Sequence, residues 1–135
     1  MTTTLKTQIQ KALKDKPGII AAYVVGSFAS ANTSKESDFD LAVVVENKNK
    51  TTENDVYNLI RSISFPKDLD LSVVDSSSSP LFLYQIISKG EKIDIGQGKQ
   101  AVDFEPRVLD NYYDNKHIRD IYYSQLKDKF PKVKR

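Results

Sequence analysis

Two aspartates stand one residue apart in this sequence, and a Gly-Ser pair precedes them with ten residues between. The aspartates are Asp38 and Asp40, and the pair is Gly26-Ser27. If the chain is a strand from residue 38 onward, residues two apart point to one face, so both carboxylates project together. Close carboxylates repel each other, and a divalent cation with oxygen ligands such as Mg²⁺ removes that repulsion. The spacing is therefore compatible with a Mg²⁺ site.

The Gly-Ser pair suggests what such a site would bind. A strand that ends in Gly26-Ser27 and turns into a helical start offers backbone N–H groups and a hydroxyl to phosphate oxygens. Glycine also lets a bulky anion approach the backbone closely. The aspartate pair alone has a plainer interpretation, two exposed acids at a strand entrance. Together the two motifs favour a phosphate and metal site across one loop.

A third acid lies in the later segment KDLDLSVVD. The alternating leucines and valines of this predicted strand face the core, so Asp70 shares the other face with Ser72. If this strand lies beside the one that begins at Asp38, Asp70 completes a carboxylate trio. Asp68 has the same parity and stays open as the alternative, whereas Asp75 lies at the opposite end. A third carboxylate can bind the metal and accept a proton from an attacking hydroxyl.

The hydrophobic pattern predicts the elements that position these residues. Buried strands are expected at 19–25, 38–45 and 69–74, with a short edge strand at 92–95. Helices are expected at 5–13, 52–62, 80–87 and 102–126, the last interrupted near Pro106, and a helical turn at 28–31 precedes a polar loop at 32–37. This order predicts an α/β (α+β) fold in one domain, residues 1–135, with a small mixed sheet of about four strands flanked by helices.

The helix expected at 102–126 carries further residues that invite a functional interpretation. Tyr112, Tyr113, Tyr122 and Tyr123 form two pairs, which fit either packing over the sheet or a partner-binding face. His117, the only histidine, fits an ordinary exposed helix position.

Composition limits the classes of function. The 135 residues are 39% hydrophobic and 28% charged, which is typical of a soluble globular domain. The net charge of +2 gives no strong reason to expect nucleic acid or an anionic membrane as partner. Cysteine is absent, and neither a signal peptide nor an apolar run of about 20 residues is present. We therefore expect a cytoplasmic protein.

The run Gly26-Ser27, ten residues, then Asp38-Phe39-Asp40 resembles the G-S-x10-D-x-D signature of the DNA polymerase beta-like nucleotidyltransferase superfamily. With the later strand acid and its short length, the chain looks like the minimal nucleotidyltransferases (MNT proteins). The segments SPLFLYQIISKGEKI and YYDNKHIRDIYY are similar to the MntA-type antitoxins, which pair with HEPN-domain RNase toxins of the HepT type. The resemblance covers roughly residues 19–125.

The resemblance implies a nucleotidyltransferase fold and a concrete activity. Such antitoxins look like ATP-dependent adenylyltransferases that transfer AMP to a tyrosine of the partner toxin and silence it. Gly26 and Ser27 would hold the nucleotide phosphates, Asp38 and Asp40 would bind Mg²⁺, and Asp70 would be the third ligand and proton acceptor. The expected partners are ATP and a HepT-type toxin, with neither a membrane nor direct nucleic-acid binding.

Two alternative functions follow, one from positions where the chain departs from the family pattern and one from comparison with larger enzymes. The family often has Arg and Gly where this chain has Ser30 and Ala31. A catalytically weak antitoxin that neutralises its toxin by stoichiometric binding is therefore the second hypothesis. Nucleotidyl transfer to a small molecule such as an aminoglycoside is the third. Enzymes of that kind usually carry an extra helical domain, for which 135 residues leave little room.

Overall fold

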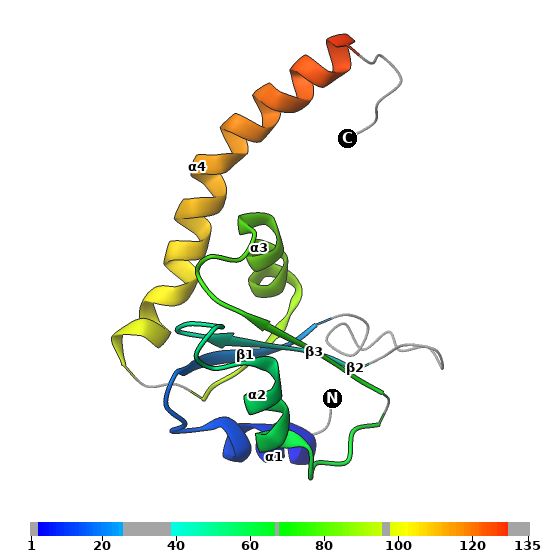
Figure 1. Ribbon diagram of the computed structural model, residues 1–135, viewed down its shortest axis with the longest axis vertical. Coiled ribbons are helices and arrows are strands. Elements are labelled where there is room, and N and C mark those ends of the chain that lie inside the picture. The colour runs from blue at the N-terminus through cyan, green and yellow to red at the C-terminus, as the bar shows by residue number, and fades with distance from the viewer. Residues whose placement is uncertain (1–2, 26–38, 67, 96–97, 130–135) are drawn as a thin grey trace.

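A four-stranded mixed sheet with helices on both faces forms the protein (Figure 1). The computed structural model describes residues 3–25, 39–66, 68–95 and 98–129. The strands are β1 (Ile19–Val25), β2 (Phe39–Val45), β3 (Leu69–Val74) and β4 (Glu91–Ile93). The helices are α1 (Thr3–Leu13), α2 (Glu53–Ile60), α3 (Pro80–Lys89) and α4 (Lys99–Lys129). The predicted fold class and mixed sheet are confirmed.

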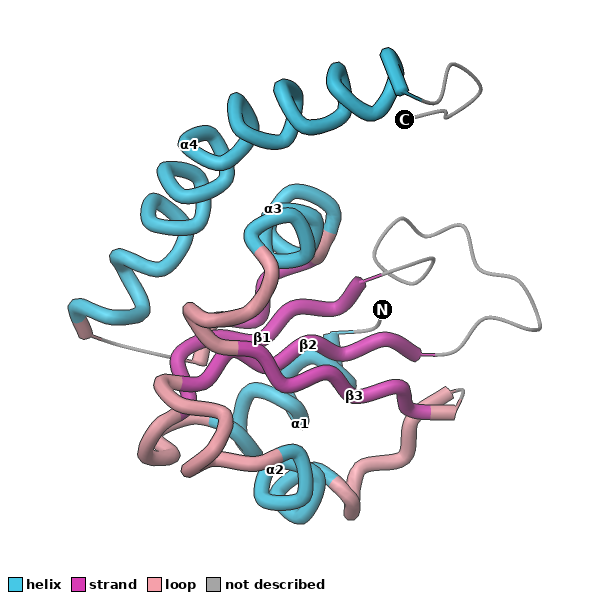
Figure 2. Tube along the Cα trace, turned by 45° about the horizontal axis from the view of Figure 1, so that its top comes forward, coloured by secondary structure: helices cyan, strands magenta, loops and turns pink. Residues whose placement is uncertain are grey.

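The sheet order is β3-β2-β1-β4, with β2 and β3 parallel and β1 antiparallel to both of its neighbours. Helices α1 and α2 cover one face, and α3 and α4 cover the other (Figure 2). Because both faces are buried, β2 is apolar almost throughout rather than alternating. Leu41, Val43 and Val45 pack against α1 and α2, whereas Ala42 and Val44 pack under α3 and α4.

Local capping signals explain where the helices begin and end. Thr52 accepts a hydrogen bond from the Asp55 N–H, and the Asp55 carboxylate accepts one from the Thr52 N–H, so the predicted cap of α2 is confirmed. Ser79 caps α3, which begins at Pro80. Gly90 ends α3 as predicted, and a Cβ there would lie 2.5 Å from the Ile86 carbonyl oxygen. The tight passage from α3 into β4 therefore requires glycine.

The predicted interruption of the last helix is wrong, because α4 runs unbroken from Lys99 to Lys129 through Pro106. Proline removes one N–H and leaves the carbonyl four residues earlier, that of Val102, without its helical donor. Val102 is 73% exposed and Pro106 is also exposed, so water can hydrate that carbonyl. The edge strand β4 is also shorter than predicted, since only Glu91 to Ile93 pair with β1. Within the described part of the chain, no helix is both long and apolar enough to span a bilayer.

A buried carboxylate joins two loops at the end of the sheet where β2 and β3 finish. Asp75 is 6% exposed and accepts hydrogen bonds from the Lys48 N–H and from the Ser77 N–H, both at 2.9 Å, and from the Ser77 hydroxyl. These donors, the Lys48 N–H first, hold the pKa of Asp75 below its ordinary value. Asp75 therefore has a structural role and lies away from the predicted site.

We expect Asp75→Ala to lower the free energy of unfolding by about 1–3 kcal/mol at neutral pH, because the Lys48 and Ser77 N–H groups lose their charged acceptor. A lowered pKa contributes stability that is present above the unfolded carboxyl pKa of about 3.9 and is lost as pH falls through the folded value. Urea denaturation at pH 7 and at acidic pH should show the difference between wild type and variant shrinking in acid. If the variant loses the same unfolding free energy at both pH values, the assigned role of the Asp75 carboxylate is contradicted.

Candidate active site

Two of the predicted site carboxylates lie side by side on neighbouring strands. The parallel register pairs Asp40 of β2 with Asp70 of β3. Paired residues on adjacent strands lie about 4.8 Å apart and project from the same face. That face also carries Ala42, Val44 and Val74, so the carboxylates lie on the side covered by α3 and α4. The predicted adjacency of these two strands is confirmed.

Asp70 and Asp68, the two candidates for the third acid, occupy different positions. Asp70 is the register partner of Asp40, and it is exposed to solvent. Asp68 precedes β3, and its backbone carbonyl accepts a 2.8 Å hydrogen bond from the Phe39 N–H. Asp68 therefore lies two residues before Asp70 in the chain, just before the start of β3. The geometry favours Asp70 as the partner of Asp40.

The remaining predicted site residues, Gly26, Ser27 and Asp38, lie outside the described residues. The same is true of the helical turn at 28–31, which includes Ser30 and Ala31, and of the polar loop at 32–37. The two flanking strands show where this segment is anchored. Val25, the last residue of β1, is the register partner of Asp40. Residues 26–38 therefore begin and end at the sheet edge that carries the two carboxylates.

The donor chemistry of this edge fits a hard divalent cation. Asp40 is half-buried and Asp70 is exposed, and both contribute carboxylate oxygens at one edge of the sheet. Mg²⁺ prefers such oxygens, usually one or two carboxylates with water and phosphate completing its coordination. Among residues that the structure describes, no three His, Cys, Asp or Glu side chains form a metal-binding group. Asp38, the predicted third member, is not among them.

A hydrogen-bonded cluster lies directly behind the carboxylates on the same sheet face. The register places Lys92, Tyr23, Ala42 and Ser72 in one row across the four strands. The next row on this face is Val25, Asp40 and Asp70. Residues two apart in a strand are about 7 Å apart, so the two rows are neighbours.

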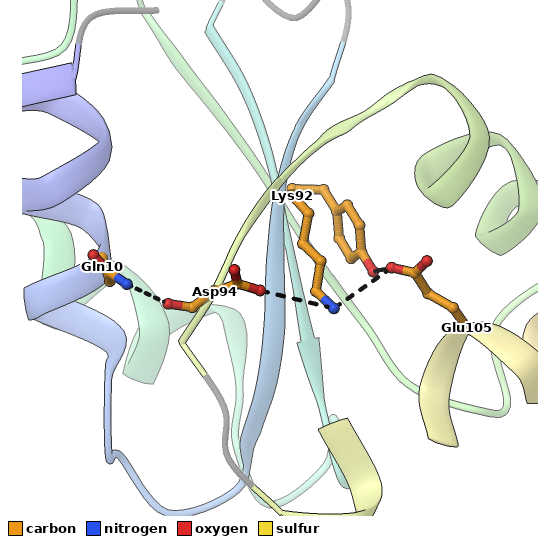
Figure 3. Close-up of polar contacts among 5 residues, drawn as sticks. Gln10, Lys92, Asp94 and Glu105 are labelled. Carbon is orange, nitrogen blue, oxygen red and sulfur yellow. Dashed lines mark hydrogen bonds and ion pairs between the residues drawn. The ribbon is translucent and has the colours of Figure 1, made fainter. Parts of the chain in front are cut away.

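Tyr23 ties the long helix to the middle of the sheet through Glu105, which Figure 3 shows near Lys92. Its side chain is 1% exposed, and its hydroxyl donates a 2.6 Å hydrogen bond to Glu105 Oε2 of α4. Lys92 Nζ lies 3.7 Å from the same oxygen and 3.9 Å from Asp94 Oδ1. Burial, and then the hydrogen bond to the Glu105 carboxylate, raise the pKa of Tyr23 well above its ordinary value. Tyr23 therefore remains a protonated donor and is not a candidate base.

The sequence analysis did not identify this cluster. Tyr23 stands in a continuous apolar run, where periodicity marks it only as a core residue. The chemistry of tyrosine could have pointed to a polar contact here, since a buried tyrosine hydroxyl needs a hydrogen-bond partner. Its partner is 82 residues away in the chain, so no local pattern could have named it.

The first predicted tyrosine pair packs against another helix rather than over the sheet. Tyr112 stacks on Tyr84 of α3 with ring centroids 3.9 Å apart, and Tyr113 meets Tyr84 edge-on at 6.4 Å. Tyr113 nevertheless remains 58% exposed. The side chains of Tyr122, Tyr123 and His117 lie outside the described ones. A partner-binding role for the tyrosines stays a hypothesis.

A cavity of about 170 Å³ lies at the other end of the sheet, away from the carboxylates. Its floor is apolar, formed by Val44, Leu83, Phe104 and Val108, and Arg107 lies at its rim. Asp40 and Asp70, the predicted site residues that the structure describes, do not line this cavity. We place the candidate site at the carboxylates, because the cavity presents no comparable set of reactive groups.

We expect Tyr23→Phe to lower the free energy of unfolding by about 1.5–3 kcal/mol at pH 7, because a hydrogen bond to a carboxylate is lost. A raised pKa contributes stability that is present below the unfolded tyrosine pKa of about 10 and is lost as pH rises further. Denaturation at pH 7 and near pH 11 should therefore show the difference between wild type and variant narrowing in alkali. A difference that does not change with pH would contradict the assigned titration.

Comparisons with solved structures identify the fold. A chain in a toxin–antitoxin crystal structure with AMP-PNP is 21% identical, with a TM-score of 0.68 over 90% of this chain and 97% of that one. A chain in an MntA–HepT toxin–antitoxin structure is 20% identical, with a TM-score of 0.64 over 93% and 98%. A third structure contains a tri-AMPylated Shewanella oneidensis HEPN toxin with an MNT antitoxin; its matching chain is 21% identical, with a TM-score of 0.62 over 95% and 98%.

Comparison with curated proteins returned no match. The family described as "Polymerase beta, Nucleotidyltransferase" matches residues 7–95, which is more than half of the chain. This span includes the Gly-Ser pair, both strands that carry Asp40 and Asp70, and the row that contains Tyr23. The chain belongs to the polymerase beta nucleotidyltransferase family.

Proposed function

We propose that this protein is a Mg²⁺-dependent nucleotidyltransferase that transfers AMP from ATP to a tyrosine of a HEPN-domain toxin of the HepT type. In this role it is an antitoxin. The observation that carries the proposal is the register of Asp40 with Asp70, at the edge where residues 26–38 join the sheet. The shared fold adds support, because matching chains come from toxin–antitoxin structures, one with AMP-PNP and one with a tri-AMPylated toxin.

The proposed roles follow from the chemistry of each residue. Asp40 and Asp70, with Asp38, would hold Mg²⁺, which when bound offsets the negative charge of the triphosphate. Gly26 and Ser27 directly follow β1 in the sequence, and the last residue of that strand pairs with Asp40. They would hold the nucleotide phosphates through N–H groups and a hydroxyl.

Asp70 is proposed to accept the proton of the attacking tyrosine hydroxyl. Its position on an edge strand and its exposure leave it accessible to a protein substrate, whereas Asp40 is half-buried in the second strand of the sheet. As the proton moves to the carboxylate, the tyrosine oxygen forms a bond to the α-phosphorus. The bond from that phosphorus to the bridging oxygen breaks, and pyrophosphate leaves on the opposite side.

We expect Asp40→Asn or Asp70→Asn to abolish AMP transfer, with a rate loss of roughly 100- to 10,000-fold for the proposed base, Asp70. The substrate is a purified HEPN-domain protein, incubated with this protein, ATP and Mg²⁺. Intact-mass spectrometry should show increments on the order of 330 Da per AMP, as nucleotidyl transfer requires. An unmodified toxin that is nevertheless bound and silenced would contradict the proposal and support stoichiometric neutralisation.

Asp68→Asn is the matched control for Asp70→Asn. Both residues are exposed aspartates, Asp70 within β3 and Asp68 just before it, and both substitutions remove one negative charge. Since Asp68 is not the register partner of Asp40, its variant should retain a transfer rate within a few-fold of wild type. Equal losses from both substitutions would show that net charge at this edge, rather than the carboxylate pair, determines the rate.

A further inference from the structure

Exposed apolar side chains gather where α3 meets α4. Tyr84, Tyr112 and Tyr113 are in ring contact there, and Leu81 and Leu109 each lie one helical turn from that contact. Leu81 and Leu109 are exposed like Tyr113. These five residues form what we call the tyrosine patch. A contiguous apolar patch on a small domain usually marks an interaction surface.

The patch lies on the same side of the sheet as the carboxylates. Asp40 and Asp70 project from the face that α3 and α4 cover. Helix α3 ends at Gly90, next to Tyr23 and Val24, which is the end of the sheet that carries the carboxylates. Tyr84 is six residues before Gly90, or roughly 9 Å along the helix axis. A protein domain about 30 Å across can therefore cover the patch and the carboxylates together.

Helix α4 extends this face beyond the rest of the domain. In two views its second half projects past α3, clear of the sheet (Figures 1 and 2). Its main contacts within the described part of the chain are with α3 and β1. An isolated helical segment of this length is only marginally stable in water, so a partner would stabilise it. The bond from Tyr23 to Glu105 holds the first half, and with it the patch, in a fixed position relative to the carboxylates.

Two exposed acids on α4, next in sequence to Leu109 and Tyr113 of the patch, indicate the charge of the partner. Asp110 and Asp114 are exposed and four residues apart on α4, where like charges destabilise a helix. Among the described residues neither forms an ion pair, whereas Asp103 in the same helix pairs with Arg107 at 3.9 Å. A lysine or arginine from another molecule would remove this repulsion. The chemistry therefore fits a partner with an apolar centre and a basic rim.

We propose that the tyrosine patch, with Asp110 and Asp114 at its rim, is the surface on which the acceptor protein docks. This inference rests on the proposed function, because it names the docking surface for that reaction's protein substrate. It assigns Tyr113 as the main apolar contact, since it is the most exposed ring of the patch. Docking there would bring the acceptor tyrosine to the carboxylates from the α3 and α4 side.

The test compares Tyr113→Ala with a control that removes an equivalent side chain elsewhere. Tyr57 is 48% exposed on α2, on the opposite face of the sheet. Binding of a purified HEPN-domain protein is measured by calorimetry without ATP. AMP transfer is measured separately with ATP and Mg²⁺. Thermal melts confirm that each variant is folded.

Tyr113→Ala should weaken binding at least about tenfold and raise KM for the acceptor protein, with kcat unchanged at saturation. Tyr57→Ala should bind within about twofold of wild type. Asp110→Lys/Asp114→Lys should also weaken binding and reduce its salt dependence. Wild-type affinity in both patch variants would overturn the proposal. So would sedimentation showing that Tyr113→Ala only separates two copies of this chain.

The binding measurement and the AMP-transfer measurement together distinguish failure of the proposed docking surface from failure of the proposed reaction. A wild-type protein that binds the HEPN-domain protein but transfers no AMP would contradict the proposed reaction, while the binding data still judge the docking surface. Efficient AMP transfer with unchanged KM in the patch variants would contradict only the docking surface.

Discussion

The parallel pairing of β2 and β3 is the constraint on which the candidate site depends. Parallel strands cannot be joined by a short hairpin, so the chain crosses over through α2 before it returns to the sheet. The crossover brings the beginnings of both strands to the same edge. Asp40 and Asp70 are near those beginnings, and the register then places them side by side. An antiparallel arrangement of the same two strands would put the carboxylates at opposite ends.

Both faces of the sheet are buried at its centre, and the carboxylates stay accessible because they lie at its end. Apolar residues fill the centre of the sheet on both sides, beneath α1 and α2 and beneath α3 and α4. The acids are confined to the end of the sheet, where water can still solvate them at little cost. Tyr23 is a polar residue in the covered region, and its hydroxyl is satisfied by Glu105. The same hydrogen bond positions α4 one row behind the carboxylates.

Much of the local structure could be predicted because its causes are local. The apolar runs at 19–25 and 69–74 became β1 and β3 with the predicted bounds. Thr52 begins α2 through its side-chain cap, and Gly90 ends α3 where a Cβ would meet the Ile86 carbonyl oxygen. The prediction was wrong at Pro106, because a proline whose freed carbonyl faces water does not stop a helix. Whether Asp38, Gly26 and Ser27 complete the site stays a prediction, since they lie outside the described residues.

The sequence by itself determined the helices, the strands and the spacing of the acids, since periodicity, capping and turn residues act over a few positions. Only the tertiary structure decided that Asp70 rather than Asp68 pairs with Asp40, because register depends on how two strands and their covering helices fit together. It also decided that Tyr23 reaches Glu105 and that Tyr84 stacks on Tyr112. Those contacts join residues far apart in the chain, and long-range packing, which no local pattern encodes, brings them together.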